Sequence, residues 1–316
     1  MSRPHPSVWR KLKQMYGVVR ESHRQPMTGT HAVPRLVEHE ELGITFIGHS
    51  SFLLQIAGRN LLVDPVFATR LILLRRARRP GLRIQDLPPI DAVLLTHAHM
   101  DHLNLPSLRK IVRHAKRLTG VAPQAIVPQG VGDLVAKLGF RSVHQLQWWE
   151  SATLDADTPE DAVEVTMTPA KHWGARMFSD THRHFGGYVI AGAGHSVYHS
   201  GDSAYFPGFR EIGQRLQPQV ALLPIGAYYP DSYRAVHTSP EEALQAFFDL
   251  GTAHTMVPMH FGTFPLGKEP MAEPPMRLMK AAERAGVADR VRVLGEGETL
   301  EVHAQVDGRR AAVLGR

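Results

Sequence analysis

The sequence contains no cysteine, and it has no apolar run long enough to cross a membrane. The absence of cysteine excludes disulfide bonds and thiolate ligands, so any metal site must be built from histidine, aspartate and glutamate. A membrane-spanning helix needs about 20 consecutive apolar residues, which no stretch of the sequence offers. Residues 1–6 lead into a polar, basic segment without the apolar core of a signal peptide. We therefore expect a cytoplasmic protein, soluble or peripheral at a membrane surface.

The chain is long enough to bury a full core, with 316 residues of which 43% are hydrophobic. Its net charge of +6 favours an anionic small molecule, a membrane surface or nucleic acid as the class of partner. A basic enzyme without any such partner is equally compatible with this charge. Residues 1–40 hold few apolar side chains among basic ones, so we expect a basic N-terminal arm there and a single domain over residues 41–316.

Hydrophobic patterns after residue 40 alternate between strands and helices. The expected strands are Gly43–Gly48, Ser51–Ile56, Leu61–Val63, Ala92–Leu95, Val163–Met167, Gly187–Ile190, Ser196–His199, Val220–Leu223 and Thr255–Met259. The expected helices are Leu105–Leu118, Pro128–Leu138, Glu241–Leu250 and Pro275–Ala285. Ser239 and Glu242 are spaced as a capping box at the start of the third helix. Strands joined by both hairpins and helical crossovers indicate an α/β fold of sheets covered by helices.

Four potential metal ligands lie within six positions, directly after the apolar strand pattern Ala92–Leu95. They are His97, His99, Asp101 and His102. In an extended segment residues two apart face the same side, so His97 and His99 can aim at one ion. Asp101 and His102 come where the chain turns toward the next helix, and a second ion can lie there. The competing interpretation, a polar loop with chance histidines, is supported only by the abundance of histidine, 19 in the chain.

Three more candidate ligands share one context, since each follows an apolar strand pattern. They are His172, Asp202 and His260. Loops at strand ends, held by a rigid sheet, are where α/β architectures place ligands and catalysts. A single histidine in such a place is more often structural, but the three together with the first cluster indicate a metal centre.

This pattern resembles the metallo-β-lactamase fold hydrolases, whose HxHxDH motif is matched by residues 97–102. The resemblance implies an αββα sandwich of two mixed sheets flanked by helices. It also implies two zinc ions, one held by His97, His99 and His172 and the other by Asp101, His102 and His260, with Asp202 bridging the pair. Asp64 looks like the family's carboxylate that orients a ligand histidine from behind. Without the resemblance, Asp64 reads as a plain turn residue.

Within this fold the chain is similar to the N-acyl-phosphatidylethanolamine-hydrolysing phospholipase D group over about residues 43–300. The similar strings are LPPIDAVL at 87–94, WWE at 148–150, HW at 172–173, PIGAY at 224–228 and HFGTF at 260–264. The chain departs from the group at Lys171, Ser203 and Phe261, where glutamine, threonine and tryptophan are expected. These departures leave the metal motif intact but leave the substrate open.

The resemblance implies a dinuclear zinc phosphodiesterase that hydrolyses N-acyl-phosphatidylethanolamine-like lipids through a hydroxide bridging the metals. Asp101 and Asp202 would be the catalytic carboxylates, with Asp101 accepting a proton. Manganese or iron suits the same ligands, so zinc follows from the resemblance and not from ligand chemistry. Two alternatives stay open: a sugar-phosphate lactonase of the same fold, and a non-catalytic metal-containing binder of lipid or nucleic acid. A nuclease is disfavoured, because the segment between Asp202 and His260 is too short for the inserted domain of the family's nucleases.

Two groups of basic residues are candidates for contacting an anionic substrate or surface. Lys171, Arg176, Arg234 and His237 lie near the ligand loops in sequence, although a surface position without a role is the favoured interpretation for Arg176, Arg234 and His237. Six arginines between Arg70 and Arg83 flank the apolar stretch Leu71–Leu74. This second segment predicts either contact with an anionic lipid leaflet or a solvated loop whose apolar residues pack into the core.

Overall fold

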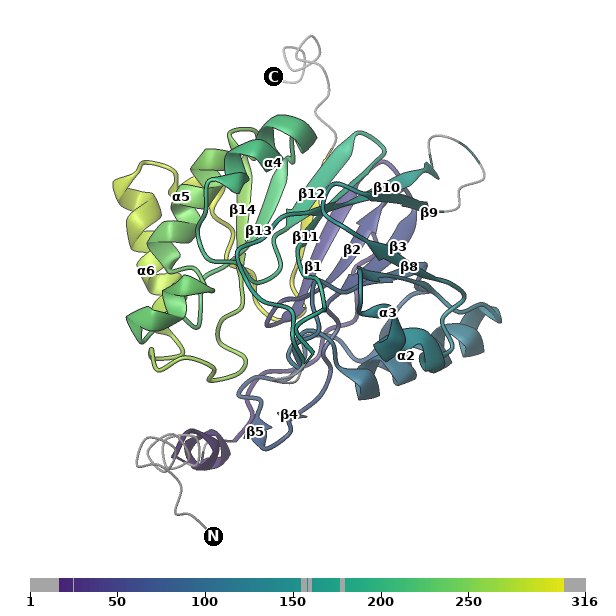
Figure 1. Cartoon of the computed structure of the whole chain (residues 1–316), viewed down its shortest axis with the longest axis horizontal. Helices are drawn as coiled ribbons and strands as arrows, with labels where there is room; N and C mark the ends of the chain where they lie inside the picture. Colours follow the sequence, from purple (N-terminus) through teal and green to yellow (C-terminus); the bar gives the residue numbers. More distant parts are fainter. Residues whose placement is uncertain (1–16, 25, 155–157, 159–160, 177–179, 304–316) are drawn as a thin grey trace, which may run out of the picture.

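The structure, a computed structural model, describes residues 17–24, 26–154, 158, 161–176 and 180–303. Two sheets are stacked face to face between two layers of helices (Figure 1). In the described residues the first sheet has the order β15-β1-β2-β3-β6-β7-β8, and the second has the order β14-β13-β12-β11-β10-β9. Each sheet mixes antiparallel and parallel pairs, as in β1–β2 and β3–β6. This is the predicted αββα sandwich of mixed sheets.

The strand bounds follow the apolar patterns of the sequence closely. The first sheet is built from β1 (Leu42–Gly48), β2 (Ser51–Ile56), β3 (Arg59–Val63), β6 (Ala92–Leu94), β7 (Gln124–Pro128), β8 (Val143–Leu146) and β15 (Thr299–Val302). The second is built from β9 (Ser151–Leu154), β10 (Val163–Thr168), β11 (Gly187–Gly192), β12 (His195–His199), β13 (Val220–Pro224) and β14 (Thr255–Met259). All the predicted strands are confirmed, whereas β7, β8, β9 and β15 were not predicted.

Helices cover the outer face of each sheet (Figure 1). α2 (Leu105–Thr119) and α3 (Gly132–Val135) lie on the first sheet, and α4 (Gly208–Leu216), α5 (Pro240–Leu250) and α6 (Glu273–Arg284) lie on the second. Three apolar cores result, one between the sheets and one under each helical layer. The capping box of Ser239 and Glu242 is present at the start of α5. The helix expected from Pro128 is shorter, because Pro128 ends β7 and the helix begins only at Gly132.

The described part of the N-terminal arm runs along the body of the protein. Residues 17–24 form a helix, and the chain after it pairs with the segment around residues 77–81. The His31 ring contacts the Pro80 carbonyl at 2.8 Å, and Arg35 forms an ion pair with Glu301 at 2.5 Å. The first sixteen residues of the predicted arm lie outside the described residues. No helix of the described residues is long and apolar enough to span a membrane.

The arginine-rich segment forms a short hairpin of β4 (Arg70–Leu71) and β5 (Leu74–Arg75). Its arginines differ in burial and in their bonding partners. Arg76 is fully buried, and its guanidinium donates hydrogen bonds of 2.7 Å to the Val66 and Arg78 carbonyls. The expectation of lipid contact is therefore wrong for Arg76, whose side chain links the Val66 and Arg78 carbonyls inside the protein. Arg78 pairs with Glu296 at 3.1 Å and Arg83 with Asp86 at 2.5 Å. Leu71 packs inward, as the solvated-loop interpretation expected, while Ile72 and Leu73 at the hairpin tip are exposed.

Candidate metal centre

The loop after β6 carries the first ligands at one end of the sandwich. It turns tightly because the His99 carbonyl accepts hydrogen bonds from the backbone N–H groups of His102 and Leu103. The Asn104 side chain then caps α2, so the loop is fixed between a buried strand and a buried helix start. The other ligands arrive from the ends of β10, β12 and β14, so the structure brings all seven predicted ligands together.

One group of side chains combines His97, His99, His172 and Asp202. One potential ligand atom of each lies within 4.8 Å of those of the others. His99 Nδ1 lies 2.8 Å from His97 Nε2 and 3.2 Å from His172 Nε2. Asp202 Oδ2 lies 3.9 Å from the Nε2 atoms of both His97 and His172. Three imidazoles and one carboxylate around one point are a suitable donor set for a divalent metal.

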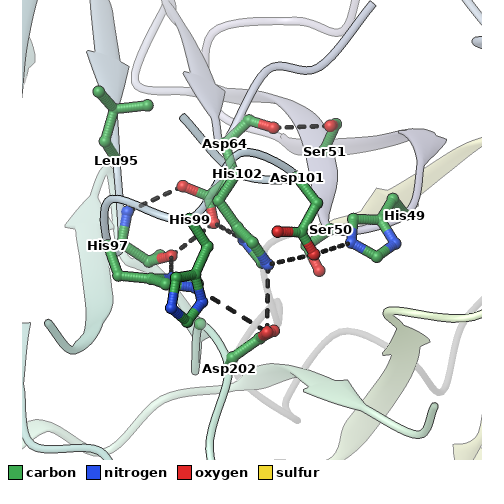
Figure 2. Close-up of polar contacts among 12 residues, drawn as sticks. His49, Ser50, Ser51, Asp64, Leu95, His97, His99, Asp101, His102 and Asp202 are labelled. Atoms are coloured by element: carbon green, nitrogen blue, oxygen red, sulfur yellow. Dashed lines mark hydrogen bonds and ion pairs between the residues drawn. The ribbon is translucent and has the colours of Figure 1, made fainter. Parts of the chain in front are cut away.

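A second group lies beside the first and combines Asp101, His102 and His260 with His49. Asp101 Oδ2 lies 3.6 Å from His260 Nε2 and 3.7 Å from His102 Nε2. His49 Nε2 lies 3.0 Å from the same oxygen (Figure 2). The sequence reasoning missed His49, although it follows β1 just as the other candidates follow their strands.

Asp202 joins the two groups. Its Oδ2 atom lies 3.2 Å from His102 Nε2 and 3.0 Å from His260 Nε2, in addition to its approach to the first group. Figure 2 shows its carboxylate aimed at the histidines of the ligand loop. One carboxylate that faces both donor sets has the placement that a bridging ligand requires.

Asp64, at the end of β3, organises the loop from behind and is fully buried. It accepts hydrogen bonds from the Thr96 backbone N–H at 2.8 Å, the Thr96 hydroxyl at 2.6 Å and His102 Nδ1 at 2.6 Å. Since the Thr96 hydroxyl donates to Asp64, it must accept from His97 Nδ1, which lies 2.9 Å away. Both rings are thereby held with Nε2 free to face the centre (Figure 2). His172 is oriented likewise, with Nδ1 2.8 Å from the Val236 carbonyl.

Burial and charge separate the histidines into two classes. Burial lowers the pKa of His172 to about 3, and it lowers the pKa of His97 well below the usual range, so both rings are neutral. Burial alone would also lower the pKa of His260, but the Asp202 and Asp101 carboxylates outweigh it and raise the pKa to about 9. The pKa of His102 is raised well above its usual value despite burial, chiefly by Asp202 and Asp64. The carboxylates around the second donor set therefore favour a positive charge there, on His102 and His260 in the absence of metal.

The chemistry of the donor set fits divalent metals. Several polar atoms of the candidate ligand residues are buried and lack any hydrogen-bond partner, among them His99 Nε2, His102 Nε2, His260 Nε2 and Asp202 Oδ1. A buried polar atom without a partner costs free energy, which coordination to a cation would offset. Two adjacent donor sets of His and Asp residues joined by one carboxylate could thus hold two ions.

The four substrate-binding candidates lie in different surroundings. His237 belongs to the centre, with Nδ1 3.8 Å from Asp202 Oδ2. Arg176 donates from Nη1 to the Ala98 and Leu103 carbonyls at 2.8 and 2.9 Å, so it supports the ligand loop. Arg234 forms an ion pair with Glu242 at the start of α5. Lys171 is exposed, and its backbone N–H donates to Ser203 Oγ.

An open pocket of about 260 Å³ leads to the centre. Its walls include Trp173, Tyr233, His237 and Leu266, and its floor includes the ligands His99, Asp101 and Asp202. The Trp173 ring packs against His99, with ring centroids 4.2 Å apart. A pocket of this size accommodates a compact polar group at the metals and leaves longer substituents outside.

Comparison with known proteins identifies the family. Residues 59–261 match the model of the β-lactamase superfamily domain. The chain is 30% identical to a metal-dependent hydrolase of Methanopyrus kandleri, over 82% of this chain and 99% of that protein. It is 29% identical to N-acyl-phosphatidylethanolamine-hydrolyzing phospholipase D 1 of Caenorhabditis elegans, over 72% of this chain and 67% of that one.

A solved structure agrees with this assignment. Igni18, a metallo hydrolase from the archaeon Ignicoccus hospitalis, superimposes with a TM-score of 0.64 at 28% identity, covering 84% of this chain and all of its own. Fold, motif and relatives lead to one conclusion: the chain belongs to the β-lactamase superfamily and is a metal-dependent hydrolase of the metallo-β-lactamase fold.

Proposed function

We propose that this protein is a dinuclear zinc phosphodiesterase of the phospholipase D type, which acts on N-acyl-phosphatidylethanolamine-like lipids. The observation that carries the proposal is the pair of donor sets joined by Asp202, because paired ions suit displacement at a phosphodiester. The relative in Caenorhabditis elegans is named for hydrolysis of this lipid class, which supports the choice of substrate. Zinc is proposed over manganese or iron from the resemblance to this family.

The residues around the centre have separate tasks in this proposal. His97, His99 and His172 would hold one ion, Asp101, His102 and His260 the other, and Asp202 both. When bound, such ions lower the pKa of water and neutralise charge on phosphate oxygens. His49 keeps Asp101 in place through its Nε2 contact of 3.0 Å.

Asp101 is the carboxylate suited to accept a proton. Its side chain is 14% exposed and lines the pocket, whereas that of Asp202 is 1% exposed. Burial opposes its ionisation, but His102, His260 and His49 keep the pKa of Asp101 well below the usual range. Asp101 is therefore ionised at neutral pH, and from the pocket lining it could accept a proton from a water held at the ions. His237, at the pocket wall, is placed to donate a hydrogen bond to a phosphate oxygen of the substrate.

The reaction would form one P–O bond to water and break the P–O bond to the N-acylethanolamine. The products are phosphatidic acid and N-acylethanolamine, and the proton that Asp101 accepts from the water would be passed on to the leaving oxygen. The pocket of about 260 Å³ fits the phosphodiester and its nearest atoms, so the acyl chains would stay outside. A pocket that takes the phosphodiester and leaves the acyl chains outside suits a substrate that remains in a lipid aggregate during hydrolysis.

The test is turnover of N-acyl-phosphatidylethanolamine in ¹⁸O-labelled water, with the metal content of the purified protein measured in parallel. We expect two zinc ions per chain, label in phosphatidic acid alone, and loss of activity with chelator. His97→Ala and Asp202→Ala should abolish turnover by removing first-group and bridging ligands, whereas His144→Ala, an exposed histidine on β8, should not. Hydrolysis of sugar-phosphate lactones without diester turnover would favour the lactonase alternative, and metal without any turnover would favour a binder.

A further inference from the structure

The β4–β5 hairpin ends in two apolar residues that face solvent. Ile72 is 74% exposed and Leu73 is 63% exposed, and together they form the whole two-residue turn. Figure 1 shows the hairpin at the lower end of the molecule, projecting away from the two sheets. Two adjacent large apolar side chains at a projecting tip are unfavourable in water, which indicates a partner outside the residues that the structure describes.

The backbone of the turn makes this choice of residues still less favourable. Ile72 has φ 54°, and Leu73, the second turn residue, is not among the residues with positive φ. A two-residue turn with positive φ at its first position normally carries glycine there. A β-branched residue in the left-handed region is strained. The isoleucine is therefore explained neither by the turn geometry nor by packing against the described part of the chain.

The base of the hairpin packs into the protein, and His23 and Ser22 of the N-terminal helix contact its backbone, while the Ile72 and Leu73 side chains stay exposed. Leu71 packs with Val66 and Phe264. The buried Arg76 guanidinium lies over the Phe264 ring at 5.4 Å, and its backbone N–H donates to the Thr69 carbonyl at 2.9 Å. A hairpin tip supported in this way can insert into a lipid surface without a change in its conformation.

The charges around the tip indicate an anionic partner. Arg70 and Arg75 are direct cross-strand partners, and like charges in this arrangement repel each other. Neither has a carboxylate within ion-pair distance among the residues that the structure describes. The chain entering the hairpin also lines a cavity of about 490 Å³ whose walls carry Arg79, Arg83, Lys110, Arg113 and Arg117. Apolar residues at a tip with cations behind them match the layering of an anionic bilayer surface.

The hairpin is also connected to the metal centre. Leu266 packs against the hairpin cluster and lines the pocket over the metal ligands. Phe264, in the same cluster, lies edge-on to His49 with ring centroids 5.4 Å apart. A surface that binds the tip would thus lie near the pocket entrance.

We infer that the β4–β5 hairpin is a membrane anchor: Ile72 and Leu73 insert into an anionic lipid surface while Arg70 and Arg75 contact its phosphates. The inference rests on the proposed lipid substrate, since it explains how the pocket reaches a headgroup within a bilayer. Insertion would place the pocket over the headgroup layer, with the acyl chains of the substrate remaining in the membrane.

The test is cosedimentation of the full chain with phosphatidylcholine vesicles that contain or lack phosphatidylglycerol. The main variant is Ile72→Gly with Leu73→Ser, because this pair suits the turn and should leave thermal stability equal or higher. We expect its vesicle affinity to fall by about tenfold or more through loss of two apolar anchors. Arg70→Ser with Arg75→Ser should reduce binding only to vesicles with phosphatidylglycerol, and its salt dependence should weaken.

Met276→Ser is the matched control, since Met276 is 70% exposed on α6, away from the hairpin (Figure 1). It should sediment like the wild type. Unchanged sedimentation of the tip variant, or no binding by the wild type, would overturn the anchor. Loss of a dimer on size exclusion, with vesicle binding retained, would also overturn it and assign the tip to contacts between copies. Failure of the proposed function would instead appear as absent turnover of detergent-dispersed lipid, whatever the sedimentation result.

Discussion

At the scale of single residues, Asp64 has the widest influence on the centre. Through Thr96 and His102 it sets which nitrogen of His97 and of His102 faces the candidate metal centre. The sequence could indicate Asp64 only through resemblance, because the fold is what brings it to the ligand loop from 32 and 38 positions away. His49 was missed for a similar reason, since one histidine in the turn after β1 gives no spacing signal of its own.

We predict that Asp64→Asn weakens metal binding roughly 10- to 100-fold, because the amide cannot accept all three hydrogen bonds as a charged acceptor. Metal content after titration with a competing chelator measures the effect. Asp86→Asn is the control, since Asp86 only pairs with the exposed Arg83. Equal metal affinity of Asp64→Asn and wild type would show that Asp64 does not orient the ligands.

The raised pKa of His260 leads to a pH prediction. Without metal, a pKa of about 9 keeps His260 protonated at neutral pH, whereas a ligand must be neutral. Metal binding should therefore release about one proton or more per chain, and affinity should fall as the pH falls below 9. Calorimetric titrations in buffers of different ionisation enthalpy count these protons. His260→Gln should release fewer, and a heat independent of buffer would refute the argument.

At the scale of elements, the sequence predicted best where a pattern was long or capped. α2 was predicted from its apolar pattern, and α5 from the capping box that begins at Ser239. α4 was missed because glycines lower helix propensity, yet Gly213 is needed there. A Cβ at Gly213 would lie 1.9 Å from the Leu250 carbonyl oxygen, so this glycine permits the close approach of α4 to α5.

The cap of α5 matters for the site, since Ser239 lies two residues after His237. We predict that Ser239→Ala lowers the free energy of unfolding by about 1 kcal/mol, because the Glu242 N–H loses its acceptor. Denaturant unfolding measures the change. Ser142→Ala, in a loop of the first sheet, should change stability by less than about 0.5 kcal/mol. An unchanged midpoint for Ser239→Ala would mean that water replaces the cap.

At the scale of the whole molecule, the centre lies where the two sheets meet. His49, His97, Asp101 and His102 follow strands of the first sheet, while His172, Asp202 and His260 follow strands of the second. The backbone N–H of His260 donates to the His49 carbonyl at 2.8 Å, which joins the two sides directly. Ions bound here would cross-link the sheets in the folded state only, since the unfolded chain does not assemble the donor sets.

We therefore predict that metal removal destabilises the entire fold. Metal present at about 1,000 times its dissociation constant contributes ~4 kcal/mol, which corresponds to a loss of unfolding temperature on the order of 10 °C with chelator. Differential scanning calorimetry with and without chelator measures it. A protein carrying both His97→Ala and His260→Ala lacks a ligand from each sheet, so chelator should leave its unfolding temperature unchanged. If chelator lowered that temperature as much as in the wild type, the stabilising ion would have to lie elsewhere than between the sheets.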